Sequence, residues 1–201
     1  MSSSRARATH WRAPGHPGEL MLMHSKLMLR LLGRDTRGTA AIEFAGASML
    51  LVTGLLNAVD LGYYEHRRME VENAAQVGAQ AAWATCNDIS SMLPATQKCP
   101  GLNAAVTAAI QSTSLGTAVS LASGYPAEGY YCVNGSNALQ SVGSLSSKPA
   151  DCTAAGNPSI SPGYYIQVGV TFSYAPLFPG VTVMSVWGIT SISQTSWMRL
   201  G

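Results

Sequence analysis

The hydrophobic pattern of the chain is dominated by one long apolar run near the N-terminus, the 21 residues Phe44–Tyr64 (FAGASMLLVTGLLNAVDLGYY). At 1.5 Å per residue, a helix of this length reaches about 32 Å, which is enough to cross the hydrocarbon core of a bilayer. Asn57 and Asp60 interrupt the run, and we expect Asp60 at the outer interface with Tyr63 and Tyr64 as anchors among the headgroups. The run therefore predicts a transmembrane helix. A secretory signal peptide is the alternative, but its apolar core is ordinarily shorter.

The helical pattern continues beyond the apolar run. Residues 65–85 contain no proline and no turn cluster, and they are rich in Ala, Glu and Gln, which favour helix. Small residues recur every four positions in both parts of this helix: Gly54, Ala58 and Gly62, then Ala74, Gly78 and Ala82. Such rows let membrane helices approach closely, and in water the second row would pack on a sheet or on another subunit. The alternative is that both rows are ordinary small residues of an Ala-rich helix.

After Cys86 the chain has short apolar segments separated by polar turns. Residues 102–111 predict a second, short helix that follows the Pro-Gly break at 100–101. Four stretches have the residue pattern of strands: 118–121, 130–133, 165–174 and 183–198. The last two are the clearest, because the first of them alternates in polarity and the second is long and β-branched. The predicted fold is α+β, with a long N-terminal helix, membrane-embedded in its first half, packed on a small antiparallel sheet.

Charge is distributed unevenly along the chain. Residues 1–38 hold seven Lys/Arg against two acidic residues, a net charge of +5, whereas residues 39–201 hold five against eight, a net charge of −3. Basic residues beside a membrane segment tend to remain cytoplasmic. We therefore predict a cytoplasmic N-terminus and an exported region from residue 65 onward. The exported part has no basic patch with interleaved aromatic residues, so no nucleic-acid partner is expected.

All four cysteines, Cys86, Cys99, Cys132 and Cys152, follow the apolar run. An even number of cysteines in an exported domain predicts disulfides, although four cysteines permit three connectivities. The alternative is four free thiols in a cytosolic domain. We favour the sequence-local pairs Cys86–Cys99 and Cys132–Cys152, each of which would stabilise the fold by roughly 3 kcal/mol through loop closure. There is no C-x-x-C motif and no histidine after His66, so we expect no metal and no cofactor.

A basic segment that ends at Gly38 precedes the apolar run. Thr39 follows the glycine, and a lone carboxylate, Glu43, stands before Phe44. An acidic residue at the centre of a membrane helix costs roughly 2.5–3.5 kcal/mol, so this carboxylate needs a partner. A cut after Gly38 would create an α-amino group, with a reference pKa of roughly 7.7–8.0, that could pair with Glu43 of the same or a neighbouring subunit. The alternatives are that Gly38 is a simple hinge and Glu43 a lone interfacial carboxylate.

Two segments carry a resemblance to a known family: RGTAAIEFA at 37–45 with its apolar continuation, and VGVTFSYAPLFP at 168–179. Together they resemble the TadE-like proteins of the tight-adherence (Flp) pilus system, a group within the type IV pilins and pseudopilins. The resemblance implies a pilin-like fold and cleavage between Gly38 and Thr39 by a prepilin peptidase, after which Glu43 is the fifth residue. The chain would be a minor pilin or pseudopilin in pilus assembly and surface attachment.

The residue pattern and the resemblance together predict a division of the chain and a set of partners. Its parts would be a cleaved basic leader (1–38) with a disordered start, a transmembrane and assembly helix (39–64), an exported continuation of this helix (65–85) and a disulfide-containing globular region (86–201). The expected partners are the prepilin peptidase, other pilins and pseudopilins, the inner-membrane assembly platform and membrane lipid. The protein would cross the bacterial inner membrane once, with its C-terminal domain in the periplasm, and incorporation into the pilus is left open.

The chain lacks a recognisable catalytic constellation. His66 is the sole histidine in residues 39–201, and no P-loop or dinucleotide-binding glycine pattern occurs. We therefore expect a structural protein and not an enzyme. An uncleaved, membrane-anchored exported domain that binds a ligand or an envelope partner is the alternative. Two further groups are expected to be structural: a solvated helix surface (Asp60, Glu65, Arg67, Arg68 and Glu70), and core or sheet-packing tryptophans (Trp83, Trp187 and Trp197).

Overall fold

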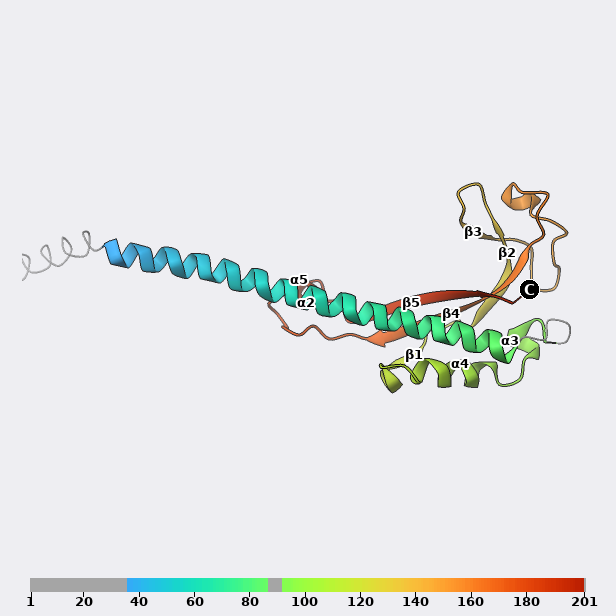
Figure 1. Cartoon of the computed structure of the whole chain (residues 1–201), viewed down its shortest axis with the longest axis horizontal. Coiled ribbons are helices and arrows are strands. Elements are labelled where there is room, and N and C mark those ends of the chain that lie inside the picture. The colour runs from blue at the N-terminus through green and yellow to red at the C-terminus, as the bar shows by residue number, and fades with distance from the viewer. Residues whose placement is uncertain (1–35, 87–91, 201) are drawn as a thin grey trace, which may run out of the picture. The chain divides into compact units, whose positions relative to one another are not determined.

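The computed structural model describes residues 36–86 and 92–200. The predicted leader lies outside the described residues except for its last three positions. The chain divides into two compact units, Met1–Val52 and Thr53–Gly201. The described part of the first unit is the beginning of helix α2 (Thr36–Thr85), and the second unit contains the rest of this helix and every other element. The predicted α+β organisation is confirmed, since this long helix packs on a small antiparallel sheet (Figure 1).

Helix α2 is long and apolar enough to cross a membrane, and none of its most apolar window is buried. No proline occurs along its 50 residues, which explains why the helix runs without a break. It ends at Thr85, immediately before the first cysteine. The residues predicted to span the membrane and those predicted to be exported therefore belong to one continuous helical element.

The sheet is built around one long central strand. Strand β4 (Gly163–Ser173) pairs along one edge with β5 (Ser191–Arg199) and along the other with two shorter strands. These two are β1 (Val119–Leu121), opposite residues 170–172 of β4, and β2 (Ala127–Val133), opposite residues 163–167. Strand β3 (Leu139–Ser141) extends the sheet beyond β2, and every pairing is antiparallel. Because β4 lies between its neighbours, the alternation predicted for residues 165–174 determines which face of the sheet meets the helices.

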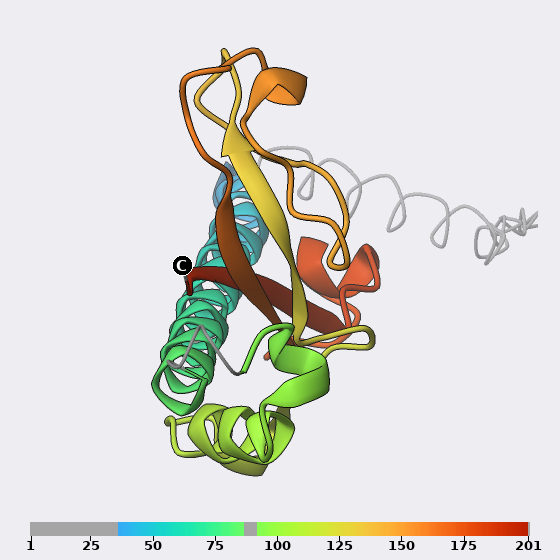
Figure 2. The same cartoon turned by 90° about the vertical axis from the view of Figure 1, so that its right-hand side faces the viewer.

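The core lies between the sheet and two helices. Ile166, Val168 and Val170 of β4 are fully buried, as their alternation predicts. Helix α4 (Leu102–Gln111), at the predicted position, buries Leu102, Val106 and Ile110. Figure 2 shows α2 and α4 beside each other next to the sheet. The part of α2 in this core is the stripe Val71, Ala74, Ala75, Ala79 and Ala82.

The predicted strand at 183–198 is wrong in its first half. The structure has a short helix there, α5 (Val183–Val186), and β5 begins only at Ser191. Gly188, with a φ of 66°, turns the chain between the two elements. The Val183 N–H donates to Asn57 Oδ1 on α2 at 2.8 Å, a tertiary contact that outweighs the local β-propensity of this valine-rich segment.

The cysteines form the two sequence-local disulfides, Cys86–Cys99 and Cys132–Cys152, each with a Cα–Cα distance of 5.7 Å. The first joins the end of α2 to the residue that follows α3 (Ala95–Lys98). The second joins β2 to the start of the 3₁₀ helix η2 (Thr153–Ala155), where the two cysteines form a small second core with Val142 and Ala155. The two disulfides therefore stabilise the region around α3 and the region around η2, both of which lie outside the pair of long strands β4 and β5.

Candidate functional site

The predicted cleavage site lies within helix α2. Gly38 and Thr39 are exposed, and a Cβ atom added at Gly38 would meet nothing within 4 Å. The described part of α2 runs from Thr36 to Thr85, so the bond after Gly38 lies in a helical turn. A protease that binds an extended segment would have to unwind this turn. Glycine favours helix by about 1 kcal/mol less than alanine, which makes this position one of the easiest in the helix to unwind.

Glu43 and Phe44 point away from the chain. Phe44 is 75% exposed, as is Ile42 on the other side of the carboxylate. Glu43 is exposed as well, and among the described residues it has no salt-bridge partner. Its pairing with a new amino terminus stays a prediction.

The two rows of small residues have different surroundings. Gly54, Ala58 and Gly62 are exposed, and a Cβ atom added at either glycine would meet nothing within 4 Å. Ala74, Gly78 and Ala82 are buried. A Cβ atom at Gly78 would lie 2.8 Å from Ile110 Cγ2 and 3.1 Å from Val168 Cγ1, closer than real atoms pack. The second row is therefore where α2 meets α4 and the sheet, whereas the first row is open to an external partner.

Asp60 is fully buried, so the prediction that it belongs to a solvated helix surface is wrong. Its Oδ1 accepts a hydrogen bond from the Leu177 N–H at 2.9 Å, and Oδ2 accepts one from the Thr182 hydroxyl. The Tyr174 hydroxyl also donates to Oδ1, at 3.4 Å. A buried carboxylate is tolerated when several donors surround it. Asp60 therefore binds the segment after β4 to the helix.

Asn57 repeats this arrangement one turn earlier. Its Oδ1 accepts from the Val183 N–H, and its amide donates to the Thr53 carbonyl at 2.8 Å. The spacing of Asn57 and Asp60 places both side chains on one face of the helix. Two polar residues three positions apart in an apolar run indicate that this face of the helix has a polar partner. The partners in residues 177–183 lie more than a hundred residues further along the chain, so the spacing does not identify them.

Tyr63 and Tyr64 lie against Tyr174, with ring centroids 5.9 and 5.3 Å from it. Both rings are half-buried, so they pack within the domain in addition to lying at the predicted outer end of the membrane span. Burial of the Tyr174 hydroxyl, together with the nearby Asp60 carboxylate, raises the pKa of Tyr174 to about 12. Tyr174 therefore stays a hydrogen-bond donor over the whole neutral range.

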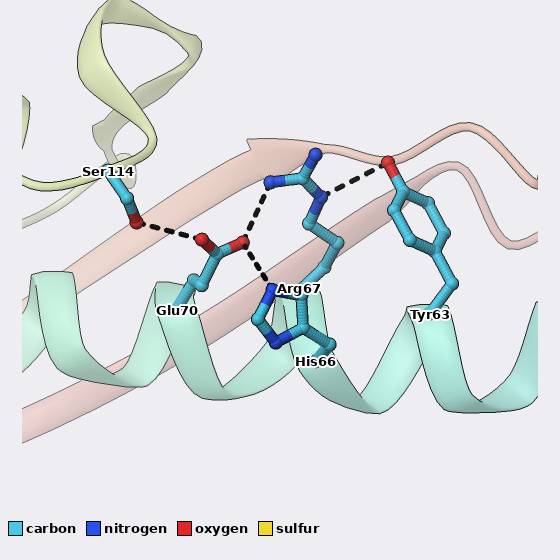
Figure 3. Close-up of polar contacts among 5 residues, drawn as sticks. All are labelled: Tyr63, His66, Arg67, Glu70 and Ser114. Atoms are coloured by element: carbon cyan, nitrogen blue, oxygen red, sulfur yellow. Dashed lines mark hydrogen bonds and ion pairs between the residues drawn. The ribbon is translucent and has the colours of Figure 1, made fainter.

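A polar cluster on α2 follows the tyrosines (Figure 3). Arg67 Nη1 donates to Glu70 Oε2 at 2.7 Å, and Arg67 Nε donates to the Tyr63 hydroxyl at 3.1 Å. Ser114, beyond α4, donates to Glu70 Oε1 at 2.8 Å, and His66 Nε2 lies 3.9 Å from Glu70 Oε2. Burial by itself would raise the pKa of Glu70, but the hydrogen bonds from Ser114 and Arg67 outweigh it and lower the pKa. The prediction of a solvated surface thus holds for Glu65 and Arg68, which are half exposed, and fails for Glu70.

A second, partly buried contact was not anticipated from the sequence. The Glu128 carboxylate accepts hydrogen bonds from the Ala95 N–H at 2.6 Å and from the Thr96 N–H at 3.1 Å, and also from the Tyr164 hydroxyl. The carboxylate thereby satisfies free N–H groups at the start of α3. A hollow of about 640 Å³ lies beside this contact, and Lys98, Tyr130 and Tyr164 are among the residues that line it.

Comparison with known proteins finds one family that matches part of the chain. Residues 38–80 match the family model of TadE-like proteins, so the chain contains a TadE-like region. No curated protein and no solved structure matches the chain significantly. The matched residues comprise the predicted cleavage glycine, the apolar run and most of residues 65–85.

Proposed function

We propose that this protein is a minor pilin or pseudopilin that is processed after Gly38 and takes part in assembling a tight-adherence pilus, and hence in surface attachment. The observation that carries the proposal is that the TadE-like match begins at Gly38 itself and covers the membrane-length helix. The role is structural and not enzymatic. The protein acts through lateral packing of α2 against other pilins and pseudopilins on the inner-membrane assembly platform.

The exposed first half of α2 supports this proposal. Its large side chains point outward, with Met49, Leu50 and Leu51 each more than 70% exposed. Such a surface is stable only in lipid or against other apolar helices. The open row Gly54, Ala58 and Gly62 gives neighbouring helices a smooth surface for close approach. The same helix surface can therefore be held by lipid before assembly and by neighbouring subunits afterwards.

The positions of Gly38 and Glu43 explain why processing would control assembly. An uncleaved chain has no amino group near Glu43, and the carboxylate would enter a helix bundle unpaired at considerable cost. Cleavage supplies a cation at Thr39, four residues before Glu43. Pairing between subunits would then favour one vertical register, because a displaced helix leaves both charges without a partner.

The proposal is tested by N-terminal sequencing of the protein extracted from membranes of its own host with an active prepilin peptidase. We expect the mature chain to begin at Thr39. Gly38→Ala should retain the leader, and the matched control Gly46→Ala, an equally open glycine in the same helix, should be processed normally. A wild-type chain that keeps its leader would overturn the proposal.

The charge pairing has a separate test. We expect Glu43→Ala to be cut normally but to abolish surface pili, counted by electron microscopy. Glu65→Ala, which removes an exposed glutamate from the exported part of the same helix, is the matched control and should leave pili unchanged. Normal pili from the Glu43 variant would refute the pairing while leaving the processing intact.

The hollow beside Glu128 favours a second candidate function, an uncleaved anchored domain that binds a small ligand. Its lining combines a cation, Lys98, with two tyrosine rings, a mixture that suits a polar ligand with an apolar part. The sequencing experiment discriminates between the two functions, since this reading requires the leader to be retained.

A further inference from the structure

The segment between β4 and β5, Tyr174–Thr190, is here named the α5 loop. It contains no charged residue, and none occurs anywhere between Asp151 and Arg199. Its apolar side chains are nevertheless exposed: Leu177 by 45%, Val181 by 52%, Val183 by 44%, Val186 by 71% and Trp187 by 72%. Trp187 was predicted to be a core or sheet-packing residue, and that prediction is wrong, as it is for Trp83, which is also exposed. So many exposed apolar side chains in one short segment indicate a surface that meets something other than water.

The α5 loop is held against a defined level of helix α2. Asp60 binds the backbone of Leu177 and the hydroxyl of Thr182, and Asn57 binds the backbone of Val183. On the helix itself, Leu55, Val59 and Leu61 are exposed at the same level, by 65%, 46% and 47%. The loop and this part of α2 both belong to the second compact unit. Their exposed side chains therefore form one apolar surface, and Figure 1 shows α5 next to the helix.

A groove runs between the two elements. It has a volume of about 320 Å³ and is lined by Asn57, Leu61, Val183, Met184 and Trp187. None of these five lining residues is charged, and the Asn57 amide already bonds within the domain. The groove thus offers contact to methylene groups and little to a polar ligand.

The level of the α5 loop on α2 points to lipid as the occupant. Asp60 precedes Tyr64, the last residue of the apolar run, by four positions, or about 6 Å of helix. Elements that lie in a membrane interface bury their apolar side by about 5–10 Å, and tryptophan is enriched at this depth. If α2 crosses the bilayer as proposed, the loop lies at the border between acyl chains and headgroups.

We propose that the α5 loop inserts into the leaflet on the exported side, with Val186 and Trp187 among the upper acyl chains and a lipid tail in the groove. The protein then contacts the bilayer through two elements, and Asn57 and Asp60 set their relative depth. This inference rests on the proposed membrane insertion of α2. It adds a lipid contact for the globular domain, which a single spanning helix would not require.

Quenching of tryptophan fluorescence by brominated phosphatidylcholine tests the proposal. The full chain is reconstituted at one copy per nanodisc, with bromines placed either near the headgroup or near the end of the acyl chain. Trp187→Phe removes the loop reporter, and Trp83→Phe is the matched control, because Trp83 is also exposed, by 49%, but follows Tyr64 by 19 residues, or about 28 Å of helix. Leu50→Trp in the Trp187→Phe background reports on insertion of α2 itself.

We expect the wild-type protein to be quenched most strongly by bromines near the headgroup, with most of this quenching lost in Trp187→Phe and retained in Trp83→Phe. Equal quenching of the wild-type and Trp187→Phe proteins, while the Leu50→Trp reporter is quenched by the deeper bromines, would overturn the inference and leave the insertion of α2 intact. An unquenched Leu50→Trp reporter would overturn the membrane insertion itself. The experiment is repeated with several copies per disc. If Trp187 is protected from quenching only under that condition, a second copy of the chain, and not lipid, covers the α5 loop, and the inference is overturned.

Discussion

The two halves of helix α2 carry the same spacing of small residues in opposite surroundings. Residues 39–64 present their small row outward, with nothing within 4 Å of an added Cβ atom at Gly54 or Gly62. Residues 65–85 turn theirs into the core, where Gly78 lies against α4 and β4. A four-residue repeat of small side chains therefore predicts that a helix can be approached closely, but not by which partner.

The largest expected effect comes from filling the buried row. Gly78→Leu places a side chain where even a Cβ atom would lie 2.8 Å from Ile110, so we expect a loss of about 3 kcal/mol or more in the free energy of unfolding. Gly62→Leu, the matched change in the open row, should leave this free energy unchanged. Urea unfolding of the detergent-solubilised proteins measures both. Equal losses would contradict the distinction between the two rows.

The end of the buried half is held by a covalent bond that the exposed half lacks. We expect Cys86→Ser with Cys99→Ser to lower the free energy of unfolding by about 3 kcal/mol, because the disulfide closes a loop in the unfolded chain. Thermal unfolding followed by circular dichroism measures the loss. Cys132→Ser with Cys152→Ser serves for comparison: it should also destabilise, yet leave the helix signal of α2 unchanged at low temperature.

Asp60 is an exception to this comparison, since it is fully buried although most of residues 39–64 are exposed. Asp60→Ala leaves the Leu177 N–H and the hydroxyls of Tyr174 and Thr182 without their acceptor, and we expect a loss of about 2 kcal/mol. Proteolysis within residues 174–190 should become faster, because the loop is no longer held. Glu65→Ala, at an exposed position, should change neither. Unchanged proteolysis in the Asp60 variant would show that apolar packing alone holds the loop.

The smallest expected effect is a pH dependence at Glu70. Its lowered pKa means that the folded protein binds this proton less readily than the unfolded chain. The resulting stability is fully present above the unfolded pKa of about 4.3 and is lost as the pH falls through the lower folded value. Glu70→Gln should therefore reduce the loss of stability between about pH 6 and pH 3. Glu72→Gln, which changes an exposed glutamate on the same helix, is the control and should leave the pH profile of stability unchanged. If Glu70→Gln has the same profile as the wild-type protein, the pH dependence does not come from Glu70.

Much of the fold could be predicted because local patterns determined it. The proline-free helix, the alternation of β4, the short helix α4 and the sequence-local disulfides each depend on residues close in sequence. The failures share a different cause. Asp60, Glu70 and the 183–190 segment take their environment from partners more than forty residues away. A carboxylate in an apolar run needs hydrogen-bond donors, because an unpaired charge is costly there. The sequence does not show which distant backbone N–H groups supply them.

The burial of Asp60 has a consequence for biogenesis. Its partners Leu177 and Thr182 follow it in the chain by 117 and 122 residues, so the ribosome completes the helix long before it makes them. If the C-terminal region is exported as proposed, the carboxylate has only water and headgroups for solvation during translocation. Secretion of nearly the whole polypeptide would then precede the final seating of the helix, and a chain truncated before residue 174 would leave a bare anion in the apolar segment.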